Sequence, residues 1–234
     1  MLCLYLQAPF GAFRNFTAGS FRPTADFITY SAAYGLLLNV AGIEMRYDDN
    51  QQPMTLIGTD LPRFRIAIAA LSFPIHQSVL QLLHNYPVGT LNLKGEALEA
   101  KKNSVKGGKY NIAPVRRSFL SGINGYICVD AYDEIESRIL NGLRGEVQRD
   151  YGLPFLGDNS FLIDRLQPVH KPNAAHWFVS VTPENPTGYR KDLVMRLTIS
   201  INRADMSRTT SGLFAPVSQL CEAPPDSAWV EVGY

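Results

Sequence analysis

The sequence predicts an α+β fold of the ferredoxin-like or RRM-like kind, with a long insertion and a β-rich C-terminal extension. Three observations lead to this prediction. Strand-like and helix-like segments follow a β-α-β-β-α-β order over residues 1–170. Residues from about 72 to 122, between the second and third strands, lack a clear pattern, and residues 171–234 read as further strands. The 234 residues, 46% of them hydrophobic, suffice for one well-cored domain with this elaboration.

The first strand and the first helix come early in the chain. Leu2, Leu4 and Leu6 alternate with other residues, and this period of two is typical of a half-buried strand. The segment 31–42 has an apolar interior, a plausible N-cap at Ser31 and a suitable left-handed stop at its last residue, glycine. It predicts a buried helix of about three turns. A strong strand over 64–71 follows.

The second half of the predicted core begins with a strand at 126–130. A helix is expected at about 133–143, because apolar residues recur on one face and Asp133 and Glu134 suit its positive end. The apolar face consists of Ile135, Ile139, Leu140 and Leu143. Further strands are predicted at 161–169, 177–182 and 193–201.

The insertion between the second and third strands is the most informative segment for function. Its window 101–117 contains six cations and no acidic residue. The cations are Lys101, Lys102, Lys106, Lys109, Arg116 and Arg117. Two adjacent glycines allow close backbone approach, and Tyr110 offers a stacking surface for a base. Six phosphate contacts would give a salt slope of about −4 on single-stranded RNA. A solvated basic loop is the alternative interpretation.

Two further segments are candidates for phosphate binding. The aromatic loop 10–30 carries Arg14 and Arg22 and leads into the first helix at Ser31, where free N–H groups favour an anion. The Gly-Asp-Asn-Ser stretch at 157–160 would offer backbone amides at Asn159 and Ser160. Stretches of this kind are more often simple turns.

Composition bounds the class of protein. The longest apolar runs are too short to cross a bilayer, and no signal-peptide pattern is visible. Cys3, Cys128 and Cys221 are too few and too scattered for a disulfide framework, so we expect a cytoplasmic protein with free thiols. The net charge of only +1 implies that any RNA binding is local or shared with partner subunits.

Catalytic motifs are largely missing, and no metal or other cofactor is expected. The histidines have no metal-ligand spacing, and no phosphate-binding or nucleophile motif is present. A lone His76 or His84 would be a general base for ribose 2′-OH attack, although a surface or packing role is the commoner one. The third strand lacks the Gly-Phe-x-Phe pattern of a standard RRM, so loops and the insertion must contact RNA.

The N-terminal segments YLQAPFGAFR at 5–14 and SAAYGLL at 31–37 resemble the Cas-five family, the DevS-type RAMP subunits of type I CRISPR Cascade complexes. The segments APVRR at 113–117 and GLPFLGDNSF at 152–161 add to this resemblance, which weakens after about residue 183. The N-terminal block is most similar to type I-B members. The resemblance implies a RAMP core with a protruding thumb at about 72–122 and a β-rich extension at 171–234.

The resemblance also implies a function and partners. Members of this family hold the 5′ handle of the crRNA and contact the large subunit and the backbone subunits of Cascade, which reaches target DNA as a complex. We therefore expect a non-catalytic RNA-binding subunit. A type I-C branch cuts precursor RNA without metal, and only Tyr47, Lys106 and His84 provide matching residue types here. A purely structural adaptor is a third reading.

Overall fold

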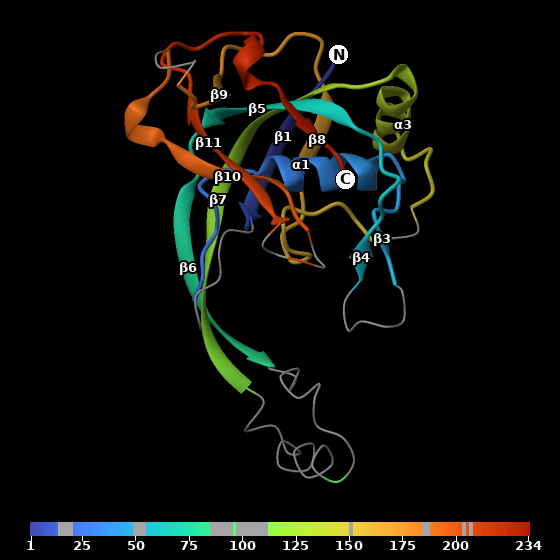
Figure 1. The fold of residues 1–234 in the computed structure, drawn as a ribbon, viewed down its shortest axis with the longest axis vertical. Helices are drawn as coiled ribbons and strands as arrows, with labels where there is room; N and C mark the ends of the chain where they lie inside the picture. Colours follow the sequence, from blue (N-terminus) through green and yellow to red (C-terminus); the bar gives the residue numbers. More distant parts are fainter. Residues whose placement is uncertain are drawn as a thin grey trace.

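The computed structural model describes residues 1–13, 21–48, 55–84, 96, 112–149, 152–183, 188–202, 205 and 208–234. The fold is α+β, with helices α1 (Tyr30–Val40) and α3 (Asp133–Leu143) packed on a large, mostly antiparallel sheet (Figure 1). No helix among the described residues is both long and apolar enough to cross a membrane.

Four strands form the centre of the sheet in the order β8–β1–β7–β5. They are β1 (Leu2–Gly11), β5 (Phe64–Ser72), β7 (Ile112–Asp130) and β8 (Arg165–Pro168). Each neighbouring pair is antiparallel. Along the chain, α1 lies between β1 and β5, and α3 lies between β7 and β8. The strands and helices predicted over residues 1–170 are therefore present in their predicted order.

Helix α1 is buried nearly all around, as its apolar sequence predicts, but its start differs from expectation. Thr29, not Ser31, is the N-cap: its hydroxyl accepts the N–H of Ala32 at 3.3 Å. Ser31 lies within the first turn, is buried, and pairs with the Thr29 hydroxyl at 3.1 Å. The helix ends as predicted, with Gly42 in the left-handed region at φ 66°.

Helix α3 packs against the end of α1. Ile135 and Ile139 are buried, whereas Asp133 and Glu134 in the first turn are exposed. Arg138 donates from Nε to the carbonyl oxygen of Ala41 at 3.1 Å, and from a terminal nitrogen to that of Gly42 at 3.3 Å. This places a guanidinium at the negative end of α1.

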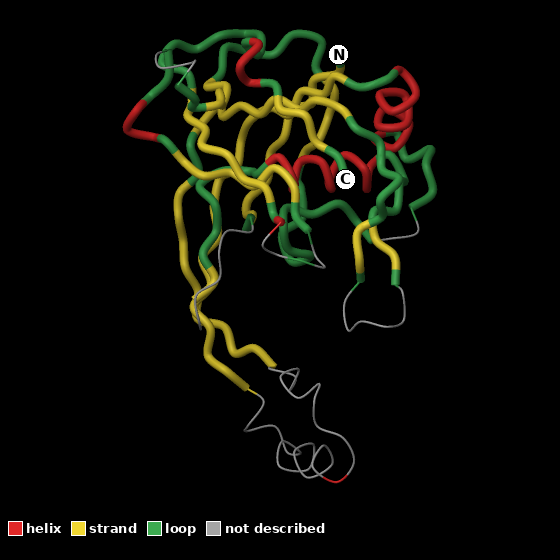
Figure 2. The backbone as a smooth tube through the Cα atoms, viewed as in Figure 1, coloured by secondary structure: helices red, strands yellow, loops and turns green. Residues whose placement is uncertain are grey.

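The segment predicted to be irregular is regular at its base. β6 (Ile75–His84) pairs with the first half of β7 in an antiparallel ribbon that projects from the body (Figure 2). Ile75, Leu80 and Leu82 on β6 are at least 65% exposed, so the strand lacks the apolar alternation of a half-buried strand. Where β7 leaves the body, Gly122 adopts φ 75°. Residues 85–95 and 97–111 lie outside the described part.

The C-terminal segment extends the same sheet. β9 (His176–Ser180), β10 (Met195–Ser200) and β11 (Thr210–Pro216) continue it beyond β5 in the order β9–β11–β10. β12 (Val230–Val232) pairs with β5 as well. The strands at β9 and β10 are predicted by sequence, but β11 and β12 are not. Three further short strands are not predicted by sequence either. They are β2 (Phe21–Arg22), which pairs with β7, and the two strands of the β3–β4 hairpin (Arg46–Tyr47, Leu56–Ile57).

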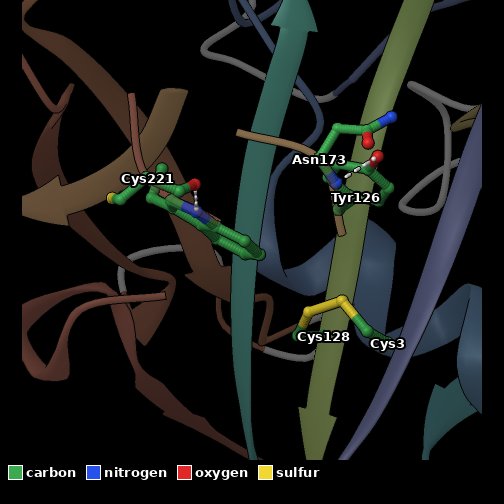
Figure 3. Close-up of a disulfide and its surroundings, with 6 residues drawn as sticks. Cys3, Tyr126, Cys128, Asn173 and Cys221 are labelled. Atoms are coloured by element: carbon green, nitrogen blue, oxygen red, sulfur yellow. Dashed lines mark hydrogen bonds between the residues drawn. A yellow bond between two sulfur atoms is a disulfide. The ribbon is translucent and has the colours of Figure 1, made fainter. Parts of the chain in front are cut away.

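The two faces of the sheet are covered differently. The larger core joins α1, α3 and one face of the central strands. The smaller core, on the other face, centres on Trp177, which stacks on Tyr126 and donates its indole N–H to the carbonyl of Cys221 at 2.8 Å. This core also contains a disulfide between Cys3 and Cys128, directly opposite each other on β1 and β7 (Figure 3). The expectation of three free thiols is therefore wrong, and only Cys221 is free.

Candidate nucleic-acid interface

The projecting half of β7 lies between two strands. β6 pairs with one edge, and β2 pairs with the other in parallel, with Phe21 opposite Arg116 and Arg22 opposite Arg117. Because successive side chains of a strand alternate between faces, the two adjacent arginines lie on opposite faces of this three-stranded unit. The sequence alone does not distinguish the two arginines, and the structure separates them.

The Arg116 face is open to solvent. Arg116 and Phe21 are exposed and line a shallow, open groove together with His76, Gln77, Ser78 and Ser118. Arg116 has no ion-pair partner among the residues that the structure describes. On the same face, Nε2 of His76 lies 2.9 Å from Oδ1 of Asp26. An exposed aromatic ring beside an exposed guanidinium is a surface that suits an unpaired nucleotide.

The Arg117 face is closed by the turn at 157–161. Arg117 forms an ion pair with Asp158, and the two side chains are only 17% and 23% exposed. Its guanidinium carbon also lies 5.3 Å from the ring centroid of Phe161. Phe161 in turn contacts Phe119 and Phe10, with ring centroids 5.9 and 6.2 Å away. On this face the cation is therefore already occupied by protein groups.

The turn itself is internally hydrogen-bonded. The N–H of Ser160 donates to Oδ1 of Asp158 at 2.9 Å, and the N–H of Phe161 donates to the Asp158 carbonyl at 2.9 Å. Burial alone would raise the pKa of Asp158, but the Ser160 N–H and the Arg117 guanidinium outweigh it and lower the pKa. Asn159 and Ser160 are exposed. The Ser160 amide proposed as a phosphate donor is thus engaged within the turn.

The remaining predicted contacts fall into two groups. Ser31 is buried and lines a cavity of about 260 Å³ along α1, which shares no lining residue with the Arg116 groove. Six others lie outside the described residues. These are Arg14, Lys101, Lys102, Lys106, Lys109 and Tyr110. The structure thus brings together Arg22, Arg116, Arg117, Asn159 and Ser160 at the base of the ribbon.

Sequence reasoning missed the acidic partners of this region. Asp26 pairs with His76, and Asp158 pairs with Arg117 across 41 positions of sequence. The sequence predicts Phe161 only as the first residue of a strand. The GDNSF stretch carries a signal for this turn. An Asp at such a position typically accepts the backbone N–H two residues further on, as Asp158 does from Ser160. Among the described residues, no cluster of three or more metal-ligating side chains occurs.

Comparison with known proteins identifies the family. The family model for the CRISPR-associated protein (Cas_Cas5) matches residues 1–121, more than half of the chain. The chain belongs to this family. The matched region of this Cas5-family protein includes β1, α1, β5, β6 and the projecting half of β7, and therefore both arginines of the interface.

Solved structures resemble the whole Cas5-family chain. One described as "CRISPR RNA-guided surveillance complex" covers 97% of this chain and 95% of its own, with TM-score 0.54 and 12% identity. Another, described as "Crystal structure of Cas protein", covers 96% and 99%, with TM-score 0.44 and 14% identity. The first shares the fold. A comparison with curated proteins gives no match.

Proposed function

We propose that this Cas5-family protein is a non-catalytic subunit of a type I Cascade complex, of the I-B kind, and that it binds and caps the 5′ handle of the crRNA. Its body is proposed to be a ferredoxin-like RAMP core. The strand order β8–β1–β7–β5, with a helix in each of the two crossovers, supports this assignment.

The observation that carries the proposal is the open face of the ribbon. Arg116 supplies a charge for a phosphate, and the neighbouring Phe21, 39% exposed, supplies a ring for a base. Arg22 lies opposite Arg117 and so belongs to the other face, but it is exposed at the edge of the same unit and adds a second cation there. Single-stranded RNA is commonly bound by such a combination, in which stacking and charge act without base pairing.

The proposed partners share the binding. With a net charge of +1, the chain alone offers little long-range attraction for RNA. The large subunit and the backbone subunits of Cascade would hold the same crRNA, and target DNA would be reached through it. The likeness to a chain of an RNA-guided surveillance complex supports this assembly. No metal or cofactor is needed for the role. We place the protein in the cytoplasm because of this proposed role and not because of its cysteines, two of which form a disulfide.

The proposal is tested by RNA binding to the purified full-length chain. The probe is a fluorescein-labelled RNA with the repeat-derived 5′ end, and anisotropy is measured over a range of salt. The double variant R22A/R116A should bind about tenfold or more weakly, with a salt slope smaller by about 1.4.

A matched control removes the same charge elsewhere. R63A/R144A changes two exposed arginines, just before β5 and at the C-cap of α3, that have no ion-pair partner among the described residues, so it should leave the slope unchanged. Equal binding by R22A/R116A and the wild type would refute the proposed surface.

A second candidate function is metal-independent cleavage of precursor crRNA, and one observation favours it. The carboxylate of Asp26 can orient His76 as a general base for the 2′-OH, beside Arg116 as a stabiliser of phosphorane charge. Incubation of the full chain with precursor RNA in EDTA tests this. Discrete cleavage at the repeat that is lost in H76A would favour the nuclease, and intact RNA would favour the binding subunit.

A further inference from the structure

Arg117 makes contacts that differ from those of an RNA ligand. Its charge is neutralised by Asp158, its guanidinium faces the ring of Phe161, and its side chain is 17% exposed. A phosphate could reach this cation only after the pair with Asp158 had opened. Such an opening would leave a partly buried carboxylate unpaired, which is unfavourable. Arg116, one residue earlier, is exposed and carries no such cost.

The partners of Arg117 are firmly joined to the body. The N–H of Ala12, just beyond β1, donates to the carbonyl of Leu156 at 3.1 Å, and the N–H of Leu156 donates to that of Phe161 at 2.9 Å. Gly157, at φ 76°, packs so closely on the carbonyl oxygen of Ala12 that no side chain would fit. The turn is therefore anchored on the body, and Arg117 connects it to the ribbon.

We propose that Arg117 is a positioning residue: together with Asp158 and Phe161 it braces the base of the ribbon against the turn at 157–161 and fixes the direction in which the ribbon presents Arg116 and Phe21. The inference rests on the proposed function for its consequence in RNA binding. The brace is needed because β7 leaves the body at Gly122, whose left-handed backbone is accessible to few other residues. Beyond this point the ribbon has no central-sheet neighbour other than the end of β1.

The variant D158N separates the two roles of Arg117, because they predict opposite changes in RNA affinity. It removes a negative charge close to the RNA surface and releases Arg117, while the side-chain oxygen can still accept the Ser160 N–H. If Arg117 were an RNA ligand, D158N would bind the fluorescein-labelled handle RNA more tightly. If Arg117 is a brace, binding weakens by about five- to tenfold, although the protein has become more positive.

Two further variants provide the matched comparison. R117K keeps the charge but loses the planar group that faces Phe161, and it should weaken binding as D158N does. R116A should weaken RNA binding with no change in the melting temperature, because Arg116 is exposed and has no ion-pair partner among the described residues. Tighter binding by D158N, or wild-type binding by R117K, would overturn the inference.

Hydrogen exchange separates this inference from the proposed function, because it needs no RNA. In the free full-length chain, backbone amides of β6 and of residues 112–121 should exchange faster in D158N and R117K than in the wild type and R116A. Unchanged exchange would refute the brace even if RNA binds as proposed. Faster exchange in a chain that does not bind the handle RNA would support the brace and refute the RNA role.

Discussion

Gly142 of α3 lies directly against the carbonyl oxygen of Val40 in α1, so that a Cβ on residue 142 would overlap this oxygen. The backbone of Gly142 is helical, and the glycine is required by the close approach of the two helices. The contact lies one turn from Arg138, which donates to the carbonyls that follow Val40. Together they define how α3 packs on α1.

The first prediction concerns this contact. G142A should lower the free energy of unfolding by about 1–3 kcal/mol, because the helices must separate to admit the methyl group. The control is G35A, at a glycine within α1 where a Cβ would meet only Met45, at an ordinary 3.7 Å. G35A should be more stable by about 0.5–1 kcal/mol, since alanine is the better helix former. Urea unfolding measures both, and a stable G142A would contradict the close contact.

The second prediction concerns Arg138. R138M keeps most of the aliphatic side chain but removes the donors to Ala41 and Gly42 and the positive charge at the end of α1. It should cost about 1–2 kcal/mol in urea unfolding. The control R144M changes the exposed C-cap residue of α3 and should change stability by less than about 0.5 kcal/mol. Equal effects of the two would show that the carbonyl contacts are unimportant.

The third prediction is a pH dependence of the brace. The pKa of Asp158 is lower in the folded protein than in the unfolded chain, so its ionised form stabilises the fold above the unfolded pKa of about 3.9. This stabilisation is lost as pH falls through the folded pKa. The difference in unfolding free energy between wild type and D158N should thus be constant from about pH 8 to 5 and shrink below that. A difference that grows on acidification would reverse the sign and refute the ion pair.

The fourth prediction concerns the thiols. Protein purified without reductant, denatured and alkylated should carry one modification, at Cys221, and three after reduction. The Cys3–Cys128 bond closes a separation of 125 residues, so its loss in C3A/C128A should cost up to about 5 kcal/mol in the chain-entropy description. Mass spectrometry counts the modified cysteines, and urea unfolding without reductant measures the loss of unfolding free energy. Three modifications before reduction would show that the sulfurs are thiols.

Local sequence patterns predict some elements of this fold closely. α3 is predicted at its observed bounds because its apolar residues recur at helical spacing and its first turn is acidic. β6 is not predicted, because both its faces meet solvent and its leucines follow no alternation. The N-cap of α1 is misplaced by two residues because serine is by residue type a better cap than threonine, whereas the structure uses Thr29.

Long-range pairings are the part that sequence reasoning could not supply. Cys3 and Cys128 become neighbours only through the β1–β7 register, and Arg117 meets Asp158 only because the turn folds back on β7. The basic character of the insertion points to Arg116 and Arg117 alike. It could not distinguish between them, since their difference comes from strand alternation and from a distant carboxylate.

The pairing of Arg117 with Asp158 limits how this protein can be recombined with its relatives. A chimera that exchanges only residues 72–122 would take the position of Arg117 from one parent and the turn with Asp158 from the other. The ion pair would then form only where both parents carry the matching side chains. The smallest transplantable module is therefore discontinuous: it comprises the ribbon and the segment 155–162, and both must be taken from the same parent.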